Sequence, residues 1–247
     1  MQAIGIDVGG SGVKAALVDT RTGEFIGERV RVDTPQPATP DAVVAATRDL
    51  IAHLPADVPI GVGFPAPVVD GVTTTASHVD PAWVGAPARD LFSRALGGPV
   101  ALLNDADAAG VGEARFGAAR GAPGVVVVLT LGTGIGSAVL HDGVLLPNTE
   151  LGHLEIRGKA AEVRAASAVR KEEGLSWHHW AERLSEVIGV IDRLLWPDLV
   201  LLGGGVSRKA EKFVPLLDVR PLVRAAQLQN RAGIAGAAAL AAEAAAA

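Results

Sequence analysis

The hydrophobic pattern of the chain alternates between two forms. Short apolar runs bounded by Gly, Pro, Asn or Asp predict β-strands, and they lie at 3–7, 13–19, 24–32, 59–64, 99–104 and 198–203. Longer segments with apolar residues every three or four positions predict helices, at 41–54, 105–117 and 176–196. The alanine-rich segment 232–247 favours a closing helix, because alanine has the highest helix propensity. Strands that alternate with helices are typical of an α/β fold.

One strand–turn–strand pattern occurs twice in the chain. The stretch "DVGGSGVKAALVD" beginning at Asp7 aligns with "TLGTGIGSAVLHD" beginning at Thr130, with Gly, Ala, Leu and Asp at matching positions. The period is too long for a solenoid repeat. The repeat therefore suggests two related lobes, although two glycine-rich hairpins could also match by chance.

Composition and charge narrow the class of protein. The chain has 247 residues, of which 49% are hydrophobic, enough for one large domain or two modest ones. It contains no cysteine, which excludes disulfides and thiolate metal sites. The net charge of −5 gives no general attraction to nucleic acid. The apolar stretch "GVVVVLTLGTGIG" is too short and too rich in glycine for a membrane span, and the N-terminal segment does not resemble a signal peptide.

Three glycine clusters are candidate phosphate sites, because successive backbone N–H groups in such turns can bind an anion. They are Gly9, Gly10, Ser11 and Gly12; Gly132, Thr133 and Gly134; and Gly203, Gly204 and Gly205. The first is expected to be longer than the two-residue turn of a plain hairpin. None matches a P-loop, and the first two lead into strands, unlike a dinucleotide motif. Each alone could be only a tight turn.

Two acidic positions stand at the ends of predicted strands. Asp7 adjoins the first glycine cluster, where a carboxylate would repel phosphate unless Mg²⁺ lies between them; it could also only cap a turn. Asn104 and Asp105 end another strand, where a carboxylate could act as general base on a substrate hydroxyl. The alternative is that Asn104 or Asp105 caps the helix that follows.

The segment "PNTELGHLEIRGKAAEVR" is unusually polar. It carries Glu150, His153, Glu155 and Glu162, whose carboxylates and imidazole would suit the hydroxyl groups of a polyol. A metal site is the rival interpretation, since His and Glu are metal ligands, but no HExxH helix supports it. A solvated loop is the third interpretation.

These motifs together resemble the ROK family of sugar kinases, and most closely its polyphosphate-using branch. The resemblance spans nearly the whole chain and includes "GIDVGGSGVK", "LNDADAAG", "LTLGTGIGSA", "NTELGHLEIRGK", "WHHWAERL" and "PDLVLLGGGVS". It implies an actin-like α/β fold of two ribonuclease-H-like lobes with a sugar cleft between them. The expected lobes are 1–105, closed by the helix 233–247, and 106–232.

The resemblance also implies a role for each candidate residue. It makes Asp105 the general base, with Asn104, Glu150, His153, Glu162, Phe64 and Pro65 around the sugar. The turns Gly9–Gly12 and Gly132–Gly134, with Lys14, would hold the donor phosphates, and Asp7 would direct Mg²⁺. Gly203–Gly205 corresponds to the loop that contacts the nucleotide in ATP-using relatives.

Two departures from the family affect these expectations. The chain has "RGKAAEVR" where many ROK proteins carry a cysteine-rich zinc loop, so no structural zinc is expected. His78 stands where an asparagine near the sugar is expected, which leaves the preference between glucose and mannose open.

The implied activity is transfer of a phosphoryl group from polyphosphate, with ATP as another donor, to the 6-hydroxyl of glucose. A polyanionic donor needs a basic track, for which the candidates are Lys14, Arg115, Arg120, Lys159, Arg164, Arg208, Lys209 and Lys212. The alternatives are a strictly ATP-dependent hexokinase for glucose or mannose and a non-catalytic sugar-sensing regulator. A cytoplasmic homodimer that binds neither nucleic acid nor membranes is expected.

Overall fold

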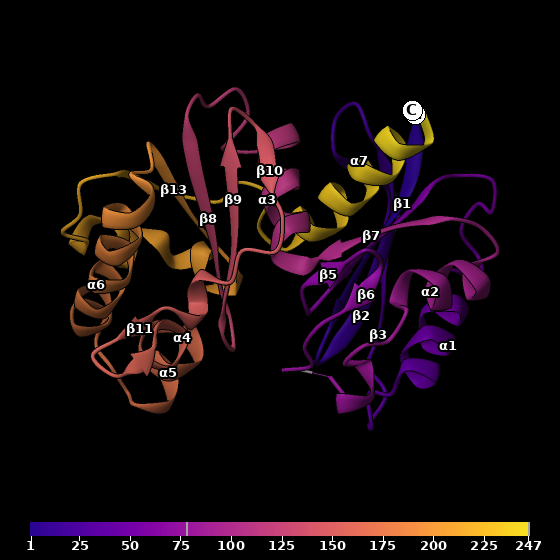
Figure 1. Cartoon of the computed structure of the whole chain (residues 1–247). Helices are drawn as coiled ribbons and strands as arrows, with labels where there is room; N and C mark the ends of the chain where they lie inside the picture. Colours follow the sequence, from indigo (N-terminus) through magenta and orange to yellow (C-terminus); the bar gives the residue numbers. More distant parts are fainter. Residues whose placement is uncertain (78, 247) are drawn as a thin grey trace. The chain divides into compact units, whose positions relative to one another are not determined.

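The computed structural model describes residues 1–77 and 79–246, and its contacts divide the chain into two compact units (Figure 1). The first unit comprises Met1–Arg115 and Arg231–Ala247, and the second comprises Phe116–Asn230. The lobes expected from the sequence, with boundaries at 105/106 and 232/233, stay a prediction. His78, on which the expected sugar preference depends, lies outside the described residues.

The first unit is built on a five-stranded sheet in the order β3-β2-β1-β4-β7. Its strands are β1 (Gln2–Gly9), β2 (Gly12–Asp19), β3 (Glu24–Val32), β4 (Ile60–Phe64) and β7 (Val100–Asn104). Strands β1, β2 and β3 pair antiparallel, whereas β1, β4 and β7 run parallel. The carboxyl ends of β1, β4 and β7 therefore lie at the same edge of the sheet.

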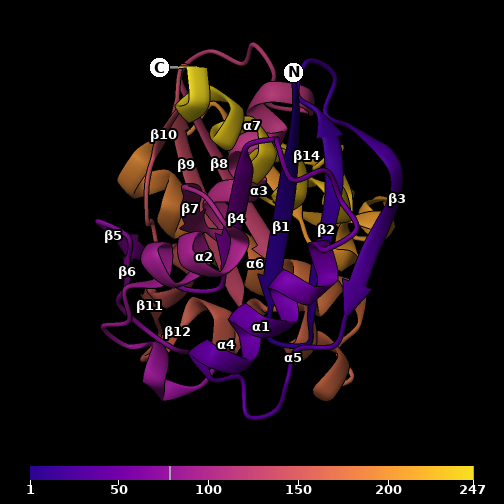
Figure 2. The ribbon, with the colours of Figure 1, turned by 90° about the vertical axis from the view of Figure 1, so that its right-hand side faces the viewer.

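Helices cover both faces of this sheet (Figure 2). They are α1 (Pro40–Ile51), α2 (Ala88–Leu96), α3 (Asp105–Phe116) and α7 (Ala232–Ala246), and a small hairpin of β5 (Val68–Val69) and β6 (Val72–Thr73) and the 3-10 turn η1 (Pro81–Trp83) complete the unit. Ile4, Ile6 and Val8 pack with α1 and α2 on one face, and Ala3, Ala16 and Val18 pack with α7 on the other. Alternate residues of one strand thus bury two different cores.

Helix α7 approaches the sheet so closely that glycine is required beneath it. A Cβ at Gly61 would lie 1.9 Å from the carbonyl oxygen of Ala237, and a Cβ at Gly5 would lie 1.9 Å from that of Ile234. We expect Gly61→Ala to lower the free energy of unfolding by about 3 kcal/mol, since overpacking forces the backbone to move. Urea unfolding measures this loss. Gly98→Ala, with no atom within 4 Å of its Cβ, is the control, and equal midpoints for the two variants would contradict the prediction.

The second unit has a sheet of the same design, in the order β10-β9-β8-β13-β14. Its strands are β8 (Val125–Leu131), β9 (Ile135–His141), β10 (Val144–Leu146), β13 (Leu199–Gly203) and β14 (Leu222–Ala225). Again three antiparallel strands are followed by parallel ones. The remaining elements are the hairpin β11 (Glu155–Ile156) and β12 (Lys159–Ala160), helices α4 (Ala161–Ala165), α5 (Ser167–Glu172) and α6 (Trp177–Leu195), and the 3-10 turns η2 (Leu151–His153), η3 (Gly205–Lys212), η4 (Val214–Leu216) and η5 (Gln229–Arg231).

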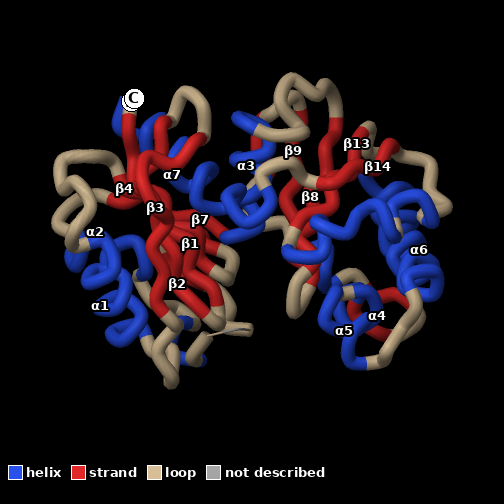
Figure 3. The backbone as a smooth tube through the Cα atoms, turned by 180° about the vertical axis from the view of Figure 1, so that it is seen from behind, coloured by secondary structure: helices blue, strands red, loops and turns tan. Residues whose placement is uncertain are grey.

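The core of this unit lies between one face of the sheet and helices α4, α5 and α6 (Figure 3). Trp180 and Phe213 are fully buried there, with ring centroids 4.8 Å apart. None of the helices in the described part of the chain is long and apolar enough to cross a membrane.

The two hairpins of the sequence repeat form, but their registers differ by one residue. Asp7 pairs with Lys14, whereas Thr130, which aligns with Asp7, pairs with Gly136. The first turn is also shorter than expected, because pairing continues to Gly9 and Gly12 and leaves only Gly10 and Ser11 between the strands. The expectation of a long first turn was therefore wrong.

Candidate functional site

The carboxyl edge of the first sheet brings three predicted site segments together. Parallel pairing places Asp7 beside Gly63, and Phe64 beside Asn104. A Cβ at Gly63 would lie 3.5 Å from the Cα of Asp105. The first residue of α3 therefore lies next to the strand that pairs with Asp7.

The N-terminal end of α7 adjoins the same edge. A Cβ at Gly233 would lie 3.7 Å from Oδ1 of Asp7 and 3.9 Å from the backbone oxygen of Asp105. Sequence reasoning did not place this helix end near the site, because the two segments are far apart in the chain. The first N–H groups of a helix have no partner within it, so this end of α7 brings backbone donors to the same edge as Asp7.

Asp7 forms an ion pair with Lys14. The Lys14 Nζ donates a hydrogen bond of 2.8 Å to Oδ2 of Asp7, and the two side chains are 22% (Asp7) and 29% (Lys14) exposed. An accessible carboxylate oxygen beside a glycine turn fits Mg²⁺, which takes one or two carboxylates and completes its shell with phosphate and water. In this structure Lys14 holds the carboxylate.

The helix cap that the sequence left open is supplied by Asn104. Its Oδ1 accepts hydrogen bonds from the N–H groups of Ala106 (2.8 Å) and Asp107 (3.2 Å). Asn104 is 5% exposed, whereas Asp105 is partly exposed. Asn104 therefore orients the start of α3, which carries Asp105.

The Phe64 ring lies in the hydrophobic core and not on the surface of the candidate site. It is fully buried, with its ring centroid 4.4 Å from that of Trp83 and 6.4 Å from that of Phe92. Pro65, the next residue, is partly exposed. The Phe64 ring thus anchors the end of β4 in the core beneath the candidate site.

In the second unit, the polar residues predicted for a sugar form one cluster. His153 Nε2 lies 3.7 Å from Oε1 of Glu162, and the N–H of Ile135 donates to Oε2 of Glu162 (3.3 Å). Burial raises the pKa of Glu150, the nearby Glu162 raises it further, and His153 opposes the shift. Glu155 is exposed on β11. Acid, imidazole and backbone groups thus converge on the start of β9.

Ser137 supports this cluster, although the sequence analysis did not select it. Its Oγ donates to the carbonyl oxygen of Thr149 (2.6 Å) and accepts from the N–H of Leu151 (2.9 Å). It is 1% exposed. Ser137 aligns with Lys14 in the internal repeat, but the two residues differ in type and in pairing partner, so the alignment gave no signal for it.

The second and third glycine clusters are neighbours. Gly203 pairs with Thr130 in parallel strands, so both clusters follow adjacent strand ends. Gly204 has a φ of +79°, and a Cβ there would lie 2.4 Å from the carbonyl oxygen of Leu131. Gly132 accepts hydrogen bonds from Ser167 Oγ (3.3 Å) and the N–H of Ala168 (3.1 Å). These contacts hold both turns at one edge of the sheet.

The rival metal interpretation of the 150–162 segment receives no support. Within the described residues, three potential metal ligands gather instead at His178, His179 and Glu182, all exposed on α6.

Three of the basic-track candidates form ion pairs with acidic side chains, and the other five are exposed. Arg115 pairs with Glu243 (2.7 Å) and Arg164 pairs with Glu186, so their charges are engaged. Arg208, Lys209 and Lys212 are exposed on η3, directly after Gly203–Gly205. Lys14 pairs with Asp7, and Arg120 and Lys159 are exposed elsewhere.

Two sheets of the same design, each with a glycine turn at its antiparallel hairpin, define an actin-like α/β fold. Residues 3–168 match the family model described as "ROK family". The chain belongs to the ROK family.

Named relatives give the comparison more detail. The chain is 52% identical over 235 residues to a polyphosphate glucokinase of Mycobacterium tuberculosis, covering 95% of this chain and 89% of the relative. Among solved structures, an inorganic polyphosphate/ATP-glucomannokinase from Arthrobacter sp. strain KM is 45% identical, with a TM-score of 0.94 and 98% of each chain covered. A ROK family glucokinase from Streptomyces griseus, at 24% identity and a TM-score of 0.84 over 98% of this chain and 100% of that one, shows the fold alone.

Proposed function

We propose that the protein transfers a phosphoryl group from inorganic polyphosphate, and also from ATP, to the 6-hydroxyl of glucose. The observation that carries the proposal is the similarity to the polyphosphate glucokinase, at 52% identity over 95% of the chain. The glucomannokinase relative supports ATP as a second donor and mannose as a second acceptor. The presence of Asp105 at the carboxyl edge of the first sheet favours a catalytic protein over a sugar-sensing regulator.

In the proposed mechanism, Asp105 accepts the proton of the 6-hydroxyl as the oxygen attacks the terminal phosphorus. Asn104, Glu150, His153 and Glu162 hold the other hydroxyl groups, so that the acceptor oxygen is held in line with the bond that breaks. Phe64 and Pro65 support this position from the end of β4. The reaction yields glucose 6-phosphate and a donor shortened by one phosphate.

The donor is proposed to lie on backbone N–H groups. Those of Gly9, Gly10, Ser11 and Gly12 and those of Gly132, Thr133 and Gly134 would bind phosphate oxygens, and Gly203, Gly204 and Gly205 would adjoin a nucleotide. Mg²⁺, held on Asp7, would neutralise the charge that develops on the transferred group. Lys14, released from Asp7, would then contact the donor.

The direct test is glucose 6-phosphate formation with Mg²⁺ and either polyphosphate or ATP as the only donor. Turnover with polyphosphate is the expected result. Turnover with ATP alone would assign the chain to ATP-dependent hexokinases and leave the role of Asp105 intact. No turnover with either donor, combined with glucose binding in calorimetry, would favour the regulator.

The exposed charges of η3 are expected to serve the polyanionic donor. Replacing Arg208, Lys209 and Lys212 together by Gln should raise the KM for polyphosphate on the order of tenfold at low salt, since each exposed contact contributes below about 1 kcal/mol. The KM for ATP should change less, and the difference should shrink as salt increases. The matched control replaces Arg48, Arg89 and Arg94, which are exposed on α1 and α2. Equal effects of the two triple variants would contradict this assignment.

A cytoplasmic homodimer remains part of the proposal. It is supported by the family resemblance. Sedimentation equilibrium of the purified protein tests the dimer, and cell fractionation tests the location.

A further inference from the structure

Helix α4 carries Glu162, but it is too short and too poorly capped to be stable by itself. It has five residues, Ala161–Ala165, and no side chain caps its N-terminus. The backbone turns out of the helix at Ala166, where ψ is 153°. A helix this short is unstable alone, and its last carbonyl groups have no partners within the helix. Its position must therefore be set by other elements.

Three side chains on successive turns of helix α6 form hydrogen bonds with α4. Trp180 Nε1 donates to the carbonyl oxygen of Ala165 (3.0 Å), and Arg183 Nη1 donates to that of Arg164 (3.3 Å). Glu186 accepts a hydrogen bond from the guanidinium of Arg164. We call Trp180, Arg183 and Glu186 the α6 clamp. They span the "WAER" motif and the turn that follows it.

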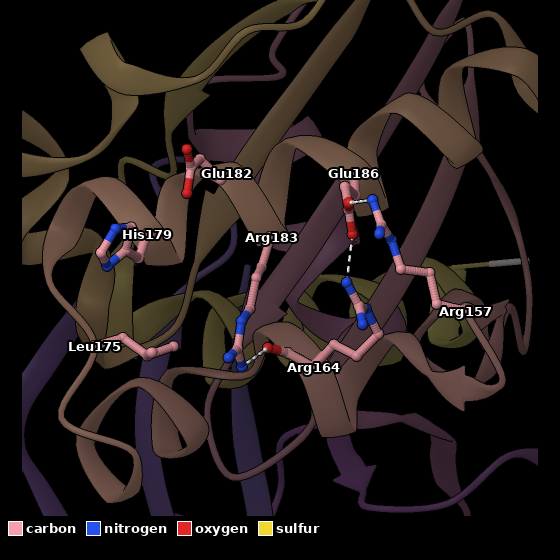
Figure 4. Close-up of a pocket in the computed structure, with 7 residues that line it drawn as sticks. All are labelled: Arg157, Arg164, Leu175, His179, Glu182, Arg183 and Glu186. Atoms are coloured by element: carbon pink, nitrogen blue, oxygen red, sulfur yellow. Dashed lines mark hydrogen bonds and ion pairs between the residues drawn. The ribbon is translucent and has the colours of Figure 1, made fainter.

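Glu186 joins two segments to α6 at once. It also accepts from Arg157, at the turn between β11 and β12, so one carboxylate holds both that hairpin and α4 (Figure 4). Burial opposes ionisation of Glu186, but the hydrogen bonds from Arg164 and Arg157 outweigh it and lower its pKa. The guanidinium of Arg164 needs this partner, because its side chain is 18% exposed and its Nε is buried without a hydrogen-bond acceptor.

The clamp holds the C-terminal end of α4, and Glu162 lies near the opposite end of this short helix. Glu162 lies two residues before Arg164, and its two carboxylate oxygens meet His153 and the N–H of Ile135. Both contacts are long, at 3.7 and 3.3 Å, so neither determines the place of the carboxylate by itself. The backbone at this end of α4 is held by the N–H of Ala161, which donates to the carbonyl oxygen of Leu154 (2.8 Å), and the α6 clamp holds the other end.

We infer that Glu186 is a positioning residue for sugar binding, which acts through Arg164 on the Glu162 carboxylate. This inference rests on the proposed function, because it takes Glu162 as a residue that holds a sugar hydroxyl. It also implies that Arg164 positions Glu162 and does not bind polyphosphate. Contacts of this kind hold a binding residue in place. This matters because a displacement of about 1 Å strongly weakens the interaction of a binding group with its substrate.

The test compares Glu186→Gln, Arg164→Met and Glu162→Gln in steady-state kinetics. Glu186→Gln should raise the KM for glucose on the order of tenfold and leave the KM for polyphosphate unchanged. Arg164→Met should do the same, whereas a donor contact would raise the KM for polyphosphate instead. Glu182→Gln is the matched control, since Glu182 lines the same pocket of about 580 Å³ one turn earlier and contacts His178 rather than α4 (Figure 4).

The decisive measurement is the double variant Glu162→Gln/Glu186→Gln. If Glu186 acts through Glu162, the double variant has the glucose KM of Glu162→Gln alone. Multiplied effects, or a glucose KM for Glu186→Gln equal to that of the control, would overturn the inference. The glucose affinities of the variants, measured by calorimetry without donor, should follow the same order. Thermal unfolding identifies a variant that fails to fold. If Arg164→Met fails to fold, Arg164→Lys is the milder substitution.

Failure of the proposed function would be recognised separately. In that case the unaltered protein would form no glucose 6-phosphate with either donor. Failure of the positioning role would leave the unaltered protein active and the Glu186→Gln variant indistinguishable from it.

Discussion

Replacing Asp105 by Asn should reduce glucose phosphorylation by about 10²–10⁴-fold, the range that a general base contributes. Asp105 is the first residue of α3, at the carboxyl edge of the sheet, beside Gly63. Asparagine has almost the same shape but accepts no proton, so the chemical step is lost while the fold is kept. The cap of α3 is also kept, because Asn104 supplies it. Single-turnover kinetics with polyphosphate and with ATP should show the loss for both donors.

Sugar binding separates this result from unfolding. Calorimetry should give Asp105→Asn and Asp105→Ala a glucose affinity close to that of the unaltered protein. Asp57→Asn, an exposed loop position of the same unit, is the control and should retain full activity. Normal turnover of Asp105→Asn would show that another group accepts the proton.

The second large effect is expected at Asp7. Asp7→Asn should lower kcat/KM by about 10²-fold or more at low Mg²⁺, because positioned charge at the transferring phosphoryl group is a major part of catalysis. The Mg²⁺ concentration for half-maximal rate should rise. A titration of rate against Mg²⁺ measures both changes, and an unchanged titration would exclude Asp7 from the metal site.

Lys14 provides the contrast for this experiment. Its Nζ lies 2.8 Å from Oδ2 of Asp7, so it competes with a metal ion for the carboxylate. Lys14→Gln should therefore lower the Mg²⁺ concentration for half-maximal rate and raise the KM for the donor. The two variants thus shift the Mg²⁺ titration in opposite directions.

Strands and long helices were predictable because their signals are local. Strand β3 covers Glu24–Val32 and helix α6 covers Trp177–Leu195, as the pattern predicted within a residue or two. Pro40 begins α1 and the chain leaves α6 just before Pro197, since proline fixes φ and lacks an N–H group.

Short elements were missed because their stability comes from distant residues. Helix α4 has only five residues, and side chains of α6 satisfy its last carbonyl groups. Helix α2, Ala88–Leu96, was also missed, since its capping residue Pro87 makes no side-chain cap. The one-residue difference in register between the two hairpins likewise leaves no mark in their aligned sequences.

By itself the sequence determined the α/β class, the internal repeat and the residue types of the candidate site. The reason is that strand periodicity, glycine turns and acidic residues at strand ends depend only on residues close together in the sequence. Only the tertiary structure decided which of these residues meet. Parallel pairing brings Asp7 beside Gly63 and Asn104 beside Phe64, and α7 returns from the end of the chain to Asp7. It also paired Asp7 with Lys14, buried the Phe64 ring and engaged Arg164 with Glu186. Except for the Asp7–Lys14 pair, which lies within one hairpin, these outcomes depend on the packing of segments that are distant in sequence, and no local pattern encodes that packing.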